Sequence, residues 1–157
     1  MASEKWVAGA GVGLTWTTIM STDLNSLASG NALLQAADIA NDSALDIYAD
    51  FSLVLASAAF VAPNFMGLFM YPLNDDASTY GDGRFTSAAA MTAANAPTPY
   101  WVGNFSLVAA TQAQKGTLSG ITLPPGKTRF VLWNQGGAAL ASSGNTLKYR
   151  TYNRSVT

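Results

Sequence analysis

Apolar and polar residues alternate along residues 45–55, which leaves this stretch little choice of local structure. The residues of one parity are Ile47, Ala49, Phe51, Leu53 and Leu55. Asp46, Tyr48, Asp50 and Ser52 have the other parity. A repeat of two residues puts the two sets on opposite faces of an extended strand. We therefore predict a half-buried β-strand with an apolar inner face and with Asp46 and Asp50 on a solvated outer face.

Similar runs, separated by residues that form turns, recur along the rest of the chain. We predict further strands over residues 15–20, 32–39, 65–71, 100–109, 117–123, 127–134 and 146–152. The run 65–71 is apolar on both faces, as expected at the centre of a sandwich or at a subunit interface. Residues 22–29 read as a short helical turn that stops at Gly30. Turns every eight to twelve residues favour an all-β fold, a jelly-roll-like β-sandwich of about eight strands.

Two segments do not fit this pattern. Residues 1–14 contain Gly9, Gly11 and Gly13, and we interpret them as a flexible N-terminal arm in front of a sandwich domain over residues 15–157. Residues 86–99 are rich in Ala and Thr but have no amphipathic stripe, so we expect a long packed loop rather than a helix.

The composition argues against catalysis. The chain has no His and no Cys, which removes the commonest general base, thiolate nucleophiles, disulfides and Cys/His zinc sites. Asp46 and Asp50, four positions apart on one strand, would have Cα atoms roughly 13 Å apart, too far for a retaining glycosidase pair. We expect a protein that is not an enzyme and that needs no cofactor.

Charge is scarce and unevenly distributed. Charged residues make up 11% of the chain, and the net charge is −1. All nine acids lie in residues 1–83, and seven of the eight bases lie in residues 84–157. Acidic and basic strands could pair within one sandwich, or acidic and basic faces could meet between subunits and fix their register. A pI near 5.0 disfavours nucleic acid as a partner, and no apolar run is long enough for a membrane helix.

The sequence offers two further candidate sites, an acidic loop for calcium and a set of aromatic residues for sugar or a protein partner. The loop 74–83 holds Asp75, Asp76 and Asp82, which with Asn74 and backbone carbonyls could bind calcium, although its spacing is not that of an EF-hand and a plain polar turn explains it as well. Aromatic residues outside the predicted core could form a platform for sugar or an anchor at a protein interface, and Trp6, Trp16 and Tyr80 are the candidates.

The C-terminal third carries a resemblance. The segments LPPGKTRFVLWN (123–134) and AALASSGNTLKYR (138–150), together with DIYAD (46–50), YGDG (80–83) and LNSLASG (24–30), resemble small virion proteins of tailed bacteriophages. Such proteins look like capsid decoration, or cement, proteins. The resemblance implies a jelly-roll subunit that forms a homotrimer, binds the major capsid protein on the outer surface of the virion and is made in the host cytoplasm.

On this interpretation the arm, the first strand and the charged strand faces make the capsid or subunit contacts. The candidate residues are Trp6, Gly9, Gly11, Gly13, Trp16, Asp46, Asp50, Lys127, Arg129, Lys148 and Arg150. The alternative is a receptor- or carbohydrate-binding sandwich of a phage tail or head fibre, with sugar bound by exposed aromatic residues around Tyr80 or Tyr100.

Overall fold

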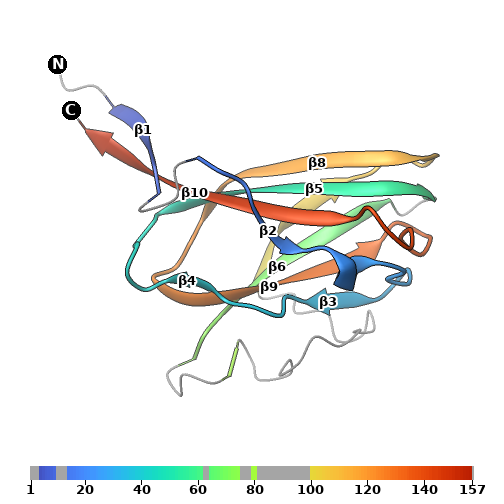
Figure 1. Ribbon diagram of the computed structural model, residues 1–157, viewed down its shortest axis with the longest axis horizontal. Helices are drawn as coiled ribbons and strands as arrows, with labels where there is room; N and C mark the ends of the chain where they lie inside the picture. Colours follow the sequence, from blue (N-terminus) through green and yellow to red (C-terminus); the bar gives the residue numbers. More distant parts are fainter. Residues whose placement is uncertain (1–3, 10–13, 62–63, 75–78, 81–99, 157) are drawn as a thin grey trace.

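The computed structural model describes residues 4–9, 14–61, 64–74, 79–80 and 100–156, and it shows a sandwich of two antiparallel sheets (Figure 1). Sheet A contains β1 (Glu4–Ala8), β2 (Thr17–Met20), β5 (Tyr48–Ala59), β8 (Thr111–Thr122) and β10 (Thr146–Val156). Sheet B contains β3 (Ala32–Leu34), β4 (Ile39–Asn41), β6 (Phe65–Pro72), β7 (Trp101–Ser106) and β9 (Gly126–Gln135). A single 3-10 turn, η1 (Thr22–Leu24), lies between β2 and β3.

The order of the strands is that of a jelly roll. β2 and β1 pair with successive stretches of β10, and β3 and β4 pair with successive stretches of β9, so each pair fills one strand position. Sheet A then runs from β1 and β2 through β10 and β5 to β8, and sheet B runs from β3 and β4 through β9 and β6 to β7. Eight positions in two interleaved sheets confirm the predicted fold class.

The main core lies between the two sheets. β5 contributes Ala49, Phe51, Leu53 and Leu55, all at most 1% exposed. Across the sandwich, the rings of Phe51 and Phe130 lie 4.5 Å apart. The alternation along residues 49–55 is thus confirmed, because only one face of this strand meets the opposite sheet.

A second apolar cluster covers the outer face of sheet B. It contains Phe69, Tyr71 and Val131 from the sheet, with Tyr80 packed over them. Arg129 lies above the ring of Tyr80, with its Cζ 4.4 Å from the ring centroid. β6 therefore lies between two apolar layers, which is why residues 65–71 are apolar on both faces.

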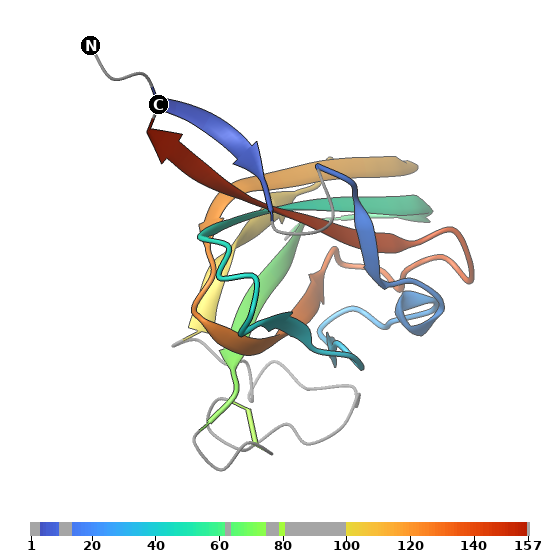
Figure 2. The same ribbon diagram turned by 60° about the vertical axis from the view of Figure 1, so that its left-hand side comes forward.

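A two-stranded ribbon projects from one end of the sandwich. β1 pairs with β10 from Ala8 opposite Tyr152 to Glu4 opposite Val156, beyond the part of β10 that pairs with β5. Figures 1 and 2 show this ribbon leaving the two sheets. The segment assigned from the sequence to a flexible arm therefore includes a paired strand, because β10 continues past the sandwich and offers it a hydrogen-bonding edge.

Other local expectations differ from the structure in detail. Residues 32–39 form two short strands, β3 and β4, rather than one. Trp101 has the same parity as the buried Phe105 but lies on the outer face of sheet B against Phe69, because the β6–β7 register shifts between Leu68 and Phe69. Ile47, expected inside, is 46% exposed because regular pairing of β5 begins only at Tyr48.

Several predictions fall on other parts of the chain. Gly11, Gly13, the acidic residues Asp75, Asp76 and Asp82, and the Ala-rich segment 86–99 lie outside the described residues. Within the described ranges, no helix is long and apolar enough to cross a membrane.

Candidate functional site

The structure separates the two aspartates that the sequence places on one solvated face. Asp46 and Asp50 are only 3% and 4% exposed, so the prediction of a solvated face is wrong. Asp50 lies on the outer face of sheet A opposite Arg150, whereas Asp46 bonds Asn153, which has the other parity on β10. Asp46 precedes the regular pairing of β5, which begins at Tyr48, so the alternation does not extend back to it.

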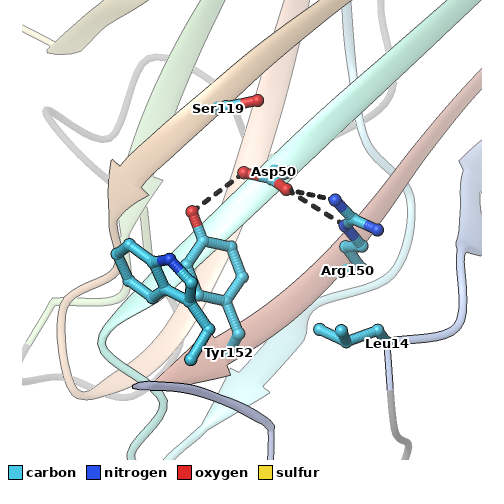
Figure 3. Close-up of a pocket in the computed structure, with 6 residues that line it drawn as sticks. Leu14, Asp50, Ser119, Arg150 and Tyr152 are labelled. Carbon is cyan, nitrogen blue, oxygen red and sulfur yellow. Dashed lines mark hydrogen bonds and ion pairs between the residues drawn. The ribbon is translucent and has the colours of Figure 1, made fainter. Parts of the chain in front are cut away.

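Asp50 is the centre of a hydrogen-bonded network on the outer face of sheet A (Figure 3). Its Oδ2 accepts hydrogen bonds from Arg150 Nε at 3.0 Å and from Arg150 Nη2 at 2.8 Å. Its Oδ1 accepts hydrogen bonds from Tyr152 Oη at 2.9 Å and from the backbone N–H of Gly120 at 3.1 Å. Four hydrogen-bond donors satisfy both carboxylate oxygens. The buried negative charge of Asp50 is therefore paired with Arg150 and hydrogen-bonded within the protein.

A β-bulge supplies the backbone donor. Ala49 pairs with Ile121 and Phe51 with Leu118, so Asp50 faces two residues of β8, Ser119 and Gly120. Gly120 has a φ of +72°, which suits glycine at a bulge. An isolated glycine within the predicted strand 117–123 is the sequence signal for this bulge, and the strand assignment from sequence passed over it.

The network sets the protonation of its members. Burial by itself would raise the pKa of Asp50, but the hydrogen bonds from Arg150, Gly120 and Tyr152 and the charge of Arg150 together hold that pKa below its ordinary value. Burial, with the hydrogen bond to Asp50, raises the pKa of Tyr152. Asp50 is therefore ionised and Tyr152 is neutral at neutral pH.

Aromatic side chains surround this network. Trp6, 61% exposed, packs edge-on against Tyr152 and Tyr48 at centroid distances of 5.2 and 5.8 Å. Arg154 Cζ lies 5.5 Å from the Trp6 ring centroid, and Arg150 Cζ lies 4.7 Å from that of Trp16. The strand pairing explains the cluster: Trp6 is opposite Arg154, and Tyr48 is opposite Tyr152.

Trp6 and the Asp50 network border an open cavity of about 300 Å³ at the base of the ribbon. Its lining consists of Trp6, Leu14, Asp50, Ser119, Arg150 and Tyr152. Figure 3 shows Arg150 and Tyr152 converging on Asp50, with Ser119 and Leu14 on opposite sides of the group. A volume of this size accommodates a small ligand or one unit of a polymer.

Asp46 belongs to a different arrangement, which fixes the end of the sandwich. Asn41 donates hydrogen bonds to the carbonyls of Asp46 and Pro124, and its Oδ1 accepts one from the Asp46 N–H. Asn153 bonds both the Asp46 carboxylate and the Ile47 N–H. Gly9 packs here too, since a Cβ at this position would collide with Thr151 Oγ1 and Asp46 Oδ2. These groups satisfy one another, and their role is structural.

The remaining charged candidates are spread over both sheets. Arg129 pairs with Asp38 at 2.7 Å on the outer face of sheet B. The Asp50 network lies on the other sheet, sheet A. Asp38–Arg129 and Asp50–Arg150 are thus two pairs formed within one chain between the acidic and the basic halves. Lys148 lies on the outer face of sheet A opposite Ser52, and Lys127 is exposed on β9.

The aromatic candidates also divide. Trp6 and Trp16 are both at the Asp50 network, whereas Tyr80 is only 5% exposed and is clamped between Arg129 and Asp38. Tyr100 packs edge-on against Tyr71. Tyr80 itself is therefore too buried to serve as an exposed sugar platform. No sequence pattern pointed to Tyr152 and Ser119, which line the cavity, or to Tyr48, which packs against Trp6 and Tyr152.

The chemistry available at this site is recognition by stacking and hydrogen bonding. Asp50, whose pKa is lowered and which Arg150 holds, is the acidic residue among the described residues that line the cavity. No group of three or more acidic, His or Cys side chains suited to a metal ion exists within the residues that the structure describes.

Neither a protein-family model nor a curated protein sequence matches this chain. Among the solved structures that are similar to it are these two. One is the CBM36-1 domain of a multidomain xylanase from the hindgut metagenome of Trinervitermes trinervoides, at 12% identity and a TM-score of 0.37, covering 99% of this chain and 97% of that one. The other is a carbohydrate-binding module CBM36 in complex with calcium and xylotriose, at 15% identity and a TM-score of 0.38, covering 99% of both chains.

Proposed function

We propose that the protein is a non-catalytic saccharide-binding module and that the cavity beside Asp50 on the outer face of sheet A is its binding site. The observation that carries this proposal is the position of an exposed indole, Trp6, at a cavity whose other walls include Arg150, Ser119 and Tyr152.

Each part of this arrangement suits a sugar. A pyranose ring has apolar C–H faces that pack on an aromatic ring and hydroxyl groups that need directed polar partners. Trp6 supplies the aromatic surface, while Arg150 and the exposed Ser119 supply donors. The Asp50 network holds Arg150 in one orientation, so ligand binding need not order that side chain.

The test is binding of the purified protein to an array of neutral and acidic glycans, followed by calorimetry with any glycan that binds. Trp6→Ala removes the stacking surface, and we expect it to lower affinity at least tenfold, since aromatic contacts of this kind contribute about 1.5 kcal/mol or more. Trp101→Phe is the control, because Trp101 is also exposed but lies on the outer face of sheet B.

The outcomes separate clearly. Binding that survives Trp101→Phe and is lost in Trp6→Ala supports the proposal. Binding lost in Trp101→Phe alone would move the site to sheet B, and no binding to any glycan by the folded protein would refute the proposal.

A second candidate function is attachment to the shell of a tailed phage, to which the resemblance of residues 123–150 points. The observation in its favour is the ribbon of β1 and β10, which projects from the sandwich (Figure 1). Trp6, Leu14, Leu45 and Ile47 are four of the seven large apolar side chains that are exposed among the described residues. Leu45 and Ile47 also line a smaller cavity of about 130 Å³.

Shell attachment predicts that the protein, as a homotrimer, occupies capsids assembled from the phage major capsid protein. Deletion of residues 1–13 removes β1 and should abolish occupancy, while β10 keeps its pairing with β2 and β5. Full occupancy by the deleted protein would contradict the role of the ribbon. Sedimentation equilibrium decides between trimer and monomer.

A further inference from the structure

We infer that the ligand of this face is an anionic saccharide, a polymer or oligomer that carries carboxylates, and that it lies along β10. The inference rests on the proposed saccharide-binding function and narrows its class of ligand. It is carried by a row of cationic and aromatic side chains on one strand.

The row follows from the alternation of β10. Lys148, Arg150, Tyr152 and Arg154 occupy every second position and share the outer face of sheet A. Successive members are separated by about 6.6 Å along the strand. Trp16 lies under Arg150 and Trp6 under Arg154, so aromatic rings accompany the cations. Such a row can contact several consecutive units of an extended chain.

The charge on this face is positive. Lys115 of β8 is opposite Val54 and adds a further cation to the outer face. On β2, β5, β8 and β10 Asp50 is the only acidic residue, and Arg150 neutralises it. β1 carries one acid and one base, Glu4 and Lys5. Neither Lys115 nor Lys148 forms an ion pair with the described residues. A ligand of opposite charge complements this excess.

The hydrogen-bonding groups point to the same class of ligand. Four donors occupy the two oxygens of Asp50, so this carboxylate has little capacity left to accept bonds from sugar hydroxyls. Arg150 uses Nε and Nη2 on Asp50, which leaves Nη1 to donate. The available groups are thus mainly donors, and an ionised carboxylate is a pure acceptor that forms strong charge-assisted hydrogen bonds with them.

The experiment compares two forms of one polymer. Polygalacturonate carries a carboxylate on each sugar, and its fully methyl-esterified form has the same backbone without the charge. We expect the acidic form to bind and the ester to bind at least tenfold more weakly, with affinity for the acidic form falling as salt rises. Alginate and hyaluronate extend the test to other uronic acids, and neutral xylo-oligosaccharides serve as uncharged ligands.

Variants locate the effect. Lys148→Gln and Arg154→Gln each remove one charge from the row and leave the Asp50–Arg150 pair intact, and we expect each to weaken polygalacturonate binding about three- to tenfold. Lys127→Gln is the matched control, since Lys127 is an exposed lysine on β9 of the other sheet. Circular dichroism of each variant confirms that it folds.

The results distinguish failure of the inference from failure of the proposed function. Equal binding of the ester and the acid, or binding of neutral glycans alone, would overturn the anionic ligand and keep the saccharide-binding function. No binding of any saccharide would overturn both. Equally tight binding of oligo-dT, with the same loss in Lys148→Gln, would show that the face selects polyanions of any kind and would overturn the saccharide class.

Discussion

Arg150 and Asp50 are direct cross-strand partners on β10 and β5, a hundred residues apart in the chain. Arg150 donates from two nitrogens to one carboxylate oxygen, which leaves the other oxygen to Tyr152 and Gly120. The pair and the Gly120 hydrogen bond together therefore join three strands of sheet A, β10, β5 and β8, and they fix Arg150, which lines the proposed binding site. Stability and ligand recognition should both depend on it.

Asp50→Asn tests the contribution of this pair to stability. The amide keeps the shape of the carboxylate but loses its charge and offers one oxygen in place of two, so Arg150 and Tyr152 lose acceptors. We expect the free energy of unfolding to fall by about 2–3 kcal/mol, measured by urea denaturation. Asp42→Asn changes an exposed acid in a turn and should alter it by less than about 0.5 kcal/mol. Equal stability of the two variants would contradict the account of the network.

The pH dependence of stability has a defined sign. The pKa of both Asp50 and Asp38 lies below the ordinary value of 3.8 in the folded protein, so these groups stabilise the fold above that pH. As the pH falls below about 4, the unfolded chain binds protons first, and stability is lost progressively. Urea midpoints measured from pH 6 to pH 2 should fall, and the fall should be shallower in Asp50→Asn. A parallel fall in both proteins would show that Asp50 does not contribute to it.

The sequence predicts the core of the sandwich well because that part depends on local alternation. Phe51, Leu53 and Phe130 are inside as expected, and Pro72 ends β6 where a residue without an N–H should end a strand. The charge split also anticipates real contacts, since Asp38–Arg129 and Asp50–Arg150 each join the acidic half to the basic half.

The site depends on relationships that alternation does not encode. Trp6 reaches Tyr48 and Tyr152 only because β1 pairs with the far end of β10, almost the whole chain away. The buried state of Asp46 follows from its position before the regular pairing of β5 and from its hydrogen bonds with the side chains of Asn41 and Asn153. Such long-range pairings and irregular turns override a period-two pattern, which describes only one strand at a time.

Asn134→Ala tests a buried amide that holds two loops. Asn134 is 0% exposed, donates to the carbonyls of Leu27 and Ala138 at 2.9 Å each, and accepts from the Gly136 N–H at 2.9 Å. Its loss leaves buried backbone groups without partners, which should cost about 2–4 kcal/mol in unfolding free energy. Asn104→Ala, at an exposed position of β7, is the control and should cost less than about 0.5 kcal/mol. Comparable losses in both variants would contradict this role of Asn134.

Thr128→Val should act in the opposite direction. Thr128 is 1% exposed, and its hydroxyl has no hydrogen-bond partner among the residues that the structure describes. Valine replaces that hydroxyl with a methyl group of similar shape and removes the cost of burying an unpaired polar atom. We expect stability to rise by about 1 kcal/mol, seen as a higher urea midpoint with an unchanged slope. A marked loss of stability would indicate a bonding partner for the hydroxyl.

Gly9→Ala tests how the ribbon is attached to the sandwich. Gly9 follows β1, bonds the Thr151 carbonyl through its N–H at 3.1 Å, and is buried. An added Cβ would collide with Thr151 Oγ1 and with the carboxylate of Asp46, which Asn153 already holds. We expect a loss of about 1–3 kcal/mol and faster hydrogen exchange in β1 than in β5, because the collision can be relieved by detaching β1 while the sandwich stays paired. Gly103→Ala is the control, since its Cβ would make only ordinary contact, at 3.4 Å, with Leu118. If β1 exchanges as slowly in Gly9→Ala as in the unaltered protein, Gly9 does not hold the ribbon in place.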